Sequence, residues 1–103
     1  MPIKRRILMK ALPNMLWYDE IGPWYEQHKY AIDEVLFWNQ TKFQDVAILV
    51  TEEYGKMLVT DGSTQSAQED EYIYHESLVH PGLTAHPGPH RVLVIGGGEG
   101  AVI

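Results

Sequence analysis

The sequence predicts an α+β fold in which a small antiparallel β domain precedes one helix and one buried strand. Apolar and β-branched runs separated by turn residues between 34 and 67 indicate the antiparallel strands. Residues 69–80 begin with three acids and end with a histidine, the charge order that a helix dipole favours. In the segment 91–95, residues 92–95 are continuously apolar and do not alternate, which indicates a buried strand.

Residues 1–16 are predicted to form a flexible basic tail. They contain half of the eight Lys and Arg residues, namely Lys4, Arg5, Arg6 and Lys10. Lys10 and Pro13 interrupt the apolar residues of the segment, so it matches neither a signal peptide nor a membrane span. Because the chain has 14 Asp and Glu, the remainder is strongly acidic, which argues against a nucleic-acid surface.

The cysteine content narrows the chemistry that the chain can perform. Its 103 residues include no cysteine. This excludes disulfides, thiolate metal sites and cysteine nucleophiles, and it favours a reducing, cytoplasmic location.

Residues 17–68 are predicted to form the small β domain. Residues 17–33 are rich in aromatic side chains and interrupted by Gly22-Pro23, so we expect a loop with one turn of helix there. Asp61-Gly62 is a strong signal for a tight turn. Strands are predicted at 34–38, 42–50, 56–60 and 63–67, with a hairpin connection at 51–55.

Residues 69–103 are predicted to form a second unit, with a helix, one strand and a glycine-rich loop. Ser66 is the expected N-cap of the helix, and Pro81-Gly82 is expected to end it. Tyr74 and Leu78, four residues apart, should share a helix face. The strand at 91–95 needs neighbouring strands that this chain does not supply.

The loop after residue 95 carries the clearest functional signal. Gly96-x-Gly98-x-x-Ala101 fits a dinucleotide fingerprint, whereas Gly96-x-Gly98-x-Gly100 equally fits the first loop of folds that bind an adenosyl sulfonium. Glu99 would repel a phosphate and attract a cation, so a positively charged ligand is favoured over NAD. The alternative is a glycine-rich turn without a ligand.

The spacing of His75 and His80 argues against a metal site. A zinc site on a helix needs histidines four residues apart, whereas these two are five apart, about 140° out of line. Tyr74 and His75 are adjacent and would project about 100° apart on a helix, so that one ring could be buried while the other lines a cleft. A packing tyrosine beside a capping histidine is the alternative.

Two glutamines and one aromatic segment are further candidates for ligand contact. Gln44 lies in a predicted strand, where it is either a solvent-facing spacer or a donor of hydrogen bonds to a ligand, and Gln65 has the same two interpretations. The segment WYDE, starting at Trp17, combines rings with acids, which suits an alkylammonium ion but also ordinary packing.

Several of these motifs occur in the order of one known family. The segments WYDE, FQD, YGKMLVTDGSTQSAQEDEYIYHE, LVHPGL and HPGPHRVLVIGGGEGA resemble the N-terminal third of the polyamine aminopropyltransferases, the spermidine synthase family. The resemblance covers about residues 17–103. Its most specific parts are the DGSTQ turn, the DEYIYHE helix and the GGGEG loop.

The resemblance implies both a fold and a reaction. It implies a Rossmann-like, methyltransferase-type α/β domain behind the small β domain. The enzymes move an aminopropyl group from the co-substrate decarboxylated S-adenosylmethionine to an amine such as putrescine, releasing spermidine and methylthioadenosine, without a further cofactor or a metal. It also implies a homo-oligomer, either a dimer or a tetramer, with no nucleic-acid or membrane partner.

The resemblance also assigns candidate site residues. The donor is expected to contact Gln44, Gly96, Gly97, Gly98 and Glu99. The amine and the aminopropyl group are expected to contact Tyr74, His75 and Glu99, with Gln65 and Trp17 lining the same cleft.

Two departures leave the acceptor amine open. Glu99 stands where spermidine synthases usually carry aspartate, and QSAQEDE is closer to the branch that includes thermospermine synthases. Putrescine, spermidine and agmatine therefore all remain candidates.

The family's catalytic aspartate would lie downstream of residue 103, so the resemblance gives this chain no catalytic residue. We expect an inactive fragment of a longer enzyme. The alternatives are a non-catalytic β module for oligomerisation or partner binding, and less favoured, a piece of an NAD-dependent oxidoreductase.

Overall fold

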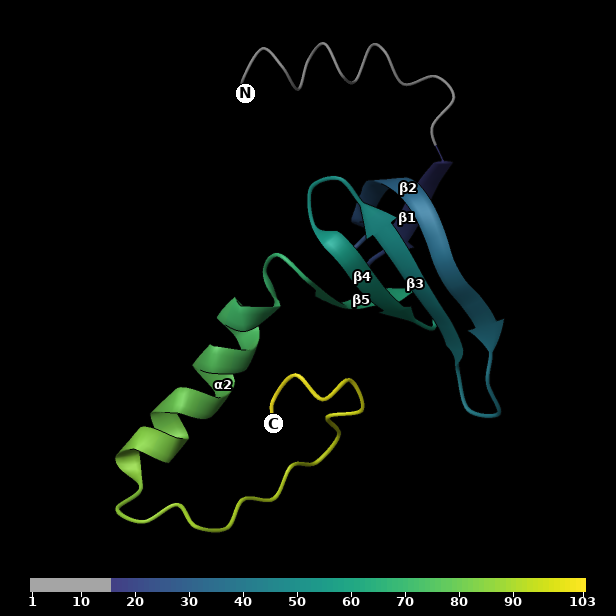
Figure 1. Cartoon of the computed structure of the whole chain (residues 1–103). Helices are drawn as coiled ribbons and strands as arrows, with labels where there is room; N and C mark the ends of the chain where they lie inside the picture. The colour runs from purple at the N-terminus through teal and green to yellow at the C-terminus, as the bar shows by residue number, and fades with distance from the viewer. Residues whose placement is uncertain (1–15) are drawn as a thin grey trace, which may run out of the picture.

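A computed structural model describes residues 16–103, and the predicted tail falls almost entirely outside them. Five strands form one antiparallel sheet in the order β1-β2-β3-β4-β5, and one helix follows (Figure 1). The elements are β1 Leu16–Ile21, β2 Gln27–Gln40, β3 Asp45–Thr51, β4 Gly55–Thr60, β5 Ser63–Ala67 and α2 Glu71–Ala85. The predicted α+β class, with a small antiparallel domain followed by one helix, is confirmed.

The expected loop at residues 17–33 is wrong, because this segment forms a hairpin. Gly22-Pro23 makes the reversal between β1 and β2, where the Gly22 amide donates to the Glu26 carbonyl over 2.8 Å. Aromatic side chains are well suited to strands, and Tyr18 lies opposite Tyr30 with the two rings stacked 6.0 Å apart. Two of the aromatic residues that suggested a loop, Tyr18 and Tyr30, therefore form a cross-strand pair.

The core lies on the inner face of this sheet. Alternate residues of β3 and β4 point inward, and Met57 is only 1% exposed. Register shifts in β2 at Asp33 and Leu36 keep Val35 and Trp38 opposite the inward-facing Leu49 and Ala47. The buried apolar residues are Ile32, Ala47, Leu49, Met57, Val59 and Ala67.

The sheet curls so that its two edge strands approach each other. The Thr64 hydroxyl of β5 donates to the Glu20 carboxylate of β1 over 2.6 Å. The Tyr18 hydroxyl of β1 donates to the carbonyl of Gly62, in the turn before β5. These bonds close the sheet over its apolar inner face.

Helix α2 differs from its predicted start and end. Asp70 occupies the N-cap position without a side-chain capping bond, and Ser66 lies in β5. The helix continues through Pro81 to Ala85, although proline has no N–H to donate and costs helix stability. Pro81 is solvent-exposed, so the helix loses one backbone hydrogen bond there without disturbing a packed core.

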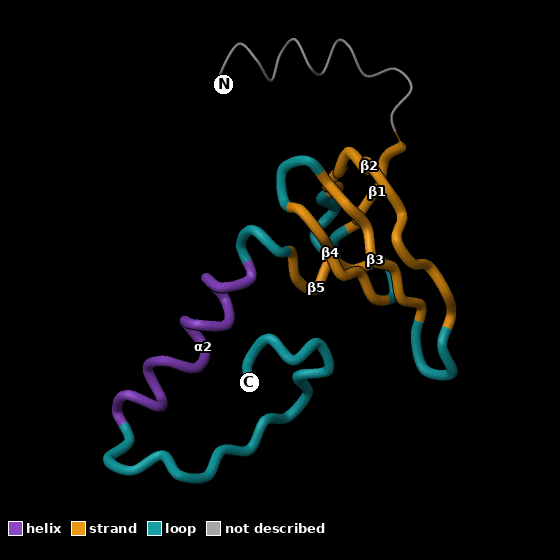
Figure 2. Tube along the Cα trace, in the orientation of Figure 1, coloured by secondary structure: helices purple, strands orange, loops and turns teal. Residues whose placement is uncertain are grey.

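Residues 91–95 form no strand with the described part of the chain. Figure 2 shows the whole segment after α2 as loop that turns back towards the sheet. Leu93 is 85% exposed and Ile95 is 91% exposed. The predicted buried strand is therefore not formed, because residues 16–90 leave no strand beside it to supply ladder hydrogen bonds.

Candidate functional site

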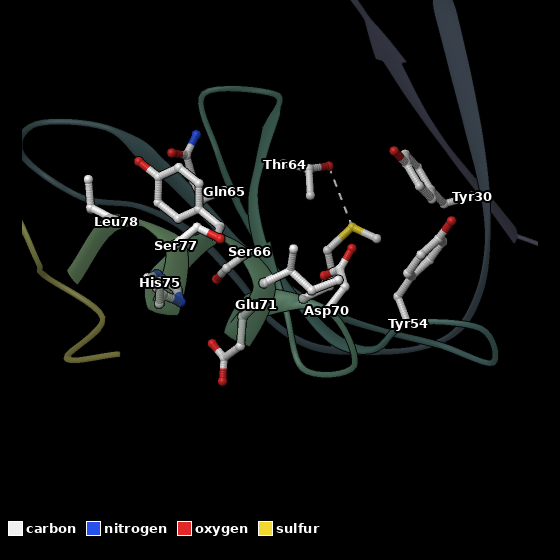
Figure 3. A pocket seen from close by; sticks show the side chains of 14 residues that line it. Tyr30, Tyr54, Thr64, Gln65, Ser66, Asp70, Glu71, His75, Ser77 and Leu78 are labelled. Carbon is white, nitrogen blue, oxygen red and sulfur yellow. Dashed lines mark hydrogen bonds between the residues drawn. The ribbon is translucent and has the colours of Figure 1, made fainter. Parts of the chain in front are cut away.

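A pocket of about 670 Å³ lies between β5 and the first turns of α2. It forms because β5 ends at Ala67 and α2 begins at Glu71, so both elements present side chains to one space. Figure 3 shows Tyr30 and Tyr54 at one end, with Gln65, His75 and Leu78 at the other. The lining residues are Tyr30, Tyr54, Met57, Thr64, Gln65, Ser66, Ala67, Asp70, Glu71, Ile73, Tyr74, His75, Ser77 and Leu78.

His75, which lines this pocket, forms a polar contact with Glu99, which does not line it. The Nε2 atom of His75 lies 3.1 Å from Oε1 of Glu99, and the Ser66 hydroxyl donates to Oε2 of the same carboxylate. His75 is only 7% exposed, and its Nδ1 atom is buried without a hydrogen-bond partner among the described residues. A buried polar atom without a partner is energetically costly.

Tyr74 and His75 diverge, as neighbours on a helix must. Tyr74 is 66% exposed while His75 is buried, and their rings meet edge to face with centroids 5.3 Å apart. Tyr74 therefore supplies an open aromatic surface beside the buried imidazole. Both residues line the same pocket.

The Gln65 side chain reaches the pocket because a β-bulge interrupts the pairing of β4 with β5. Ser66 pairs with Leu58 and Thr64 with Val59, which leaves Gln65 as the extra residue on β5. Such bulges redirect a side chain. The Gln65 amide donates to the Ser63 carbonyl over 3.2 Å and lines the pocket near His75 (Figure 3).

Gln44 is not in a strand, contrary to the prediction, and it does not line this pocket. It lies in the connection between β2 and β3, where its side chain is exposed. The Thr41 hydroxyl accepts from the Gln44 amide over 3.0 Å and donates to the Gln44 carbonyl over 2.8 Å. A side chain that bonds its own loop competes with the ladder, so β3 starts at Asp45, three residues later than predicted.

Trp17 also lies away from the pocket that holds His75. It lines a second pocket of about 150 Å³ at the opening of the curled sheet, together with Trp38 and Asp45. The indole N–H of Trp38 donates to both Asp45 carboxylate oxygens over 3.2 Å. Of the predicted contacts, the structure brings together Gln65, Tyr74, His75 and Glu99, and it leaves Gln44 and Trp17 elsewhere.

The glycine-rich loop adopts the backbone that only glycine takes readily. Gly96 and Gly97 have φ angles of 91° and 69°. A Cβ atom on Gly97 would lie 2.8 Å from Cγ1 of Val94. None of the three glycines 96–98 lines the described pocket, and the loop meets the site through Glu99.

Sequence reasoning missed the tyrosine end of the pocket. Tyr30 and Tyr54 meet edge to face with centroids 6.0 Å apart, and Asp70 lies between them and His75 in Figure 3. Burial raises the pKa of the Tyr30 hydroxyl above its ordinary value, and the charge of Glu20 raises it further. Tyr30 lies two residues before the apolar Ile32, and this strand spacing was the signal that could have placed Tyr30 on the inner face.

The arrangement is suited to a cation. A carboxylate held by Ser66 and His75 offers negative charge, and the exposed Tyr74 ring offers a π face. Among residues 16–103, no group of three or more His, Cys, Asp or Glu side chains could hold a metal ion. No helix in this described range is long and apolar enough to cross a membrane.

Comparison with known proteins gives the same assignment along nearly the whole described chain. The family model described as "Spermidine synthase tetramerisation domain" matches residues 16–68. The one described as "Spermine/spermidine synthase domain" matches residues 71–103.

Individual relatives are similar over most of this chain. A polyamine aminopropyltransferase from Hyperthermus butylicus is 50% identical over 74 residues, which are 72% of this chain and 25% of that protein. A thermospermine synthase from Arabidopsis thaliana is 46% identical over 85 residues, 82% of this chain and 25% of that protein. The chain therefore spans about a quarter of the length of these relatives.

A solved structure has the same fold over the shared region. The crystal structure of spermidine synthase from Thermotoga maritima superposes with a TM-score of 0.83 at 31% identity. The match covers 90% of this chain and 35% of that one.

Proposed function

The chain belongs to the spermidine synthase family, and from this membership we propose that it acts in polyamine aminopropyl transfer. The co-substrate would be decarboxylated S-adenosylmethionine and the acceptor a small amine such as putrescine. The products would be spermidine and methylthioadenosine. The chain would contribute the assembly domain and one wall of the substrate site.

The His75–Glu99 pair is the observation that carries this proposal. The donor is a sulfonium with a primary amine, and the acceptor is an ammonium ion before it reacts. A carboxylate held in place by two partners favours both cations over a phosphate-bearing dinucleotide. This charge preference also makes an NAD-dependent oxidoreductase the weaker hypothesis.

In this reaction the enzyme has to align the two substrates more than it has to activate them. The acceptor nitrogen attacks the aminopropyl carbon next to sulfur, the new C–N bond forms as the C–S bond breaks, and the electron pair leaves on sulfur as a neutral thioether. Tyr74 and Glu99 would hold the acceptor in line, which lowers the entropic cost of the transfer. The proton acceptor is expected from a residue outside this chain, which stays a prediction.

The remaining predicted contacts form part of the same proposal. Gln44 and Gly96–Gly98 would contact the adenosyl portion of the donor, and Trp17 would contact the amine. In this chain Gln44 and Trp17 do not line the pocket that His75 lines, so a ligand in that pocket would have to extend beyond it to reach them. A cytoplasmic location also stays a prediction.

The assembly proposal rests on residues 16–68. We propose a homotetramer, because the family model that matches this range is described as a tetramerisation domain. A chain that assembles without taking part in catalysis is the second candidate function.

A chimera tests the enzymatic proposal. Residues 16–103 would replace the matching segment of the Thermotoga maritima spermidine synthase, and the product would be assayed with decarboxylated S-adenosylmethionine and putrescine, spermidine or agmatine. Transfer to any of the three supports the proposal. A chimera that assembles like its parent but transfers to none contradicts it and favours the assembly module.

A further inference from the structure

Ser66 and Thr64 of β5 point to opposite faces of the sheet because the pairing of β5 with β4 is irregular. Ser66 pairs with Leu58 and Thr64 pairs with Val59, so the two serve as partners of adjacent residues in β4. Adjacent residues of a strand point to opposite faces. In a regular strand, residues 64 and 66 would share one face, and the extra residue between them separates the two hydroxyls.

The hydrogen bonds of the two hydroxyls follow this division. The Thr64 hydroxyl donates to the Glu20 carboxylate over 2.6 Å and lies 3.5 Å from Sδ of Met57, which is 1% exposed (Figure 3). The Ser66 hydroxyl instead donates to the Glu99 carboxylate of the glycine-rich loop. The bulge therefore directs Ser66 towards the loop while Thr64 stays with the core.

Both oxygens of the Glu99 carboxylate have a partner. Nε2 of His75 lies 3.1 Å from Oε1, and the Ser66 hydroxyl donates to Oε2. The side chains of His75 and Glu99 are 9% and 26% exposed, so water has limited access to this contact. The turn that carries Glu99 is closed by the Gly100 amide, which donates to the Gly97 carbonyl over 3.0 Å. The orientation of the carboxylate is therefore set jointly by α2 and β5.

We propose that Ser66 is a positioning residue for the cationic donor, that it acts through Glu99, and that it requires a glutamate at this position. The inference rests on the proposed function, in which the Glu99 carboxylate attracts decarboxylated S-adenosylmethionine. Aspartate is one methylene shorter, and from the same turn it would have to give up either His75 or Ser66. The glutamate of the GGGEG loop is thus matched in length to the serine of β5.

Loss of Ser66 should affect charged and neutral ligands differently. Without the hydroxyl, Glu99 keeps its charge but loses one of its two anchors. A side chain with one anchor samples more rotamers, and these have to be restricted again when a cation binds. This penalty applies to the sulfonium donor, which binds the charge, and not to neutral methylthioadenosine.

The first test is calorimetric titration of the full 103-residue chain with decarboxylated S-adenosylmethionine and with methylthioadenosine. Ser66→Ala should weaken donor binding about threefold to tenfold and change methylthioadenosine binding much less. Ser66→Thr keeps the hydroxyl and should recover most of the donor affinity. The matched control is Ser63→Ala, the same change at an exposed residue of β5 that does not line the pocket.

The second test asks whether Ser66 acts through Glu99. In a Glu99→Gln background, Ser66→Ala should weaken donor binding by less than about twofold, because the charge that it positions is absent. Glu99→Asp keeps the charge and shortens the side chain, so it should weaken donor binding about threefold to tenfold. Donor binding by Glu99→Asp that equals the parent's overturns the length match.

The outcomes separate this inference from the proposal beneath it. A parent chain that binds the donor no more tightly than methylthioadenosine overturns the proposed function. A parent that prefers the donor overturns the role of Ser66 alone if Ser66→Ala binds as the parent does, or weakens binding equally with and without the Glu99 charge. An equal loss for both ligands in Ser66→Ala also overturns it, because a purely structural role would act on both.

Discussion

The imidazole of His75 and the carboxylate of Glu99 lie 3.1 Å apart, although 24 residues separate them in the chain. The contact ties the glycine-rich loop to α2, and the Ser66 hydroxyl ties the same carboxylate to β5. Three segments thus meet at one acid. A carboxylate oriented before the ligand arrives loses less entropy on binding.

The charge of Glu99 should decide which ligand binds. Glu99→Gln removes the charge but keeps the shape, so affinity for the sulfonium donor should fall about 10-fold to 100-fold. Affinity for neutral methylthioadenosine should change much less. Calorimetric titration with both ligands measures this, with Glu52→Gln as the control at an exposed acid in the turn between β3 and β4. An equal loss for both ligands would show that Glu99 does not act through charge.

Two neighbouring glycines provide a matched test of the loop. Gly97→Ala forces alanine into a left-handed backbone, at about 1–2 kcal/mol, and brings its Cβ to 2.8 Å from Val94. Gly98→Ala meets nothing within 4 Å. Titration with methylthioadenosine should therefore show weaker binding for the first variant only. Equal affinities would mean that the loop does not shape the site.

Met57 should be the residue on which the sheet depends most. It is 1% exposed, belongs to β4 and lines the pocket. Met57→Ala should lower the free energy of unfolding by about 2–5 kcal/mol in urea titration. Lys56→Ala, at the neighbouring exposed position, should change it by less than about 0.5 kcal/mol. If Met57→Ala left the free energy of unfolding unchanged, the core would have to lie elsewhere.

Stability should fall at alkaline pH because of two tyrosines. Burial, followed by the charge of Glu20, raises the pKa of Tyr18 and of Tyr30 above the ordinary 10.0. A raised folded-state pKa means that the neutral form is stabilised, so this contribution is complete below pH 10 and is lost as pH rises through the folded pKa. Melting temperatures from about pH 8 to about pH 11 should fall less steeply for Tyr30→Phe. A slope identical to the parent would contradict the assignment.

The strands between Asp45 and Ala67 were predictable because alternation and turn residues are local signals. The Asp61-Gly62 turn, for example, places Asp61 at a φ of 49° and Gly62 at 77° between β4 and β5. The hairpin at 16–33 was not predictable in this way, because its stability comes from cross-strand partners such as Tyr18 and Tyr30. Helix α2 outlasted the expected stop at Pro81, since one lost backbone bond at an exposed site does not end a helix.

The sequence predicted only part of the geometry of the candidate site, and the roles of its residues stay predictions. Glu99, Tyr74 and His75 were identified by residue type and motif, and they do come together. No sequence pattern could show that Ser66 would hold Glu99 instead of capping α2, because that contact depends on how the loop folds back. Trp17 and His75 were expected in one cleft, but curling of the sheet gives them separate pockets.

The decisive measurement is methylthioadenosine release by the Thermotoga chimera, with and without Glu99→Gln. We expect the chimera to release methylthioadenosine in equal amounts with the aminopropylated amine, and the variant to lose about 100-fold or more in turnover. A chimera that folds and assembles but releases no methylthioadenosine, or that releases it equally well without the Glu99 charge, would show that the proposed role of Glu99 in aminopropyl transfer is wrong.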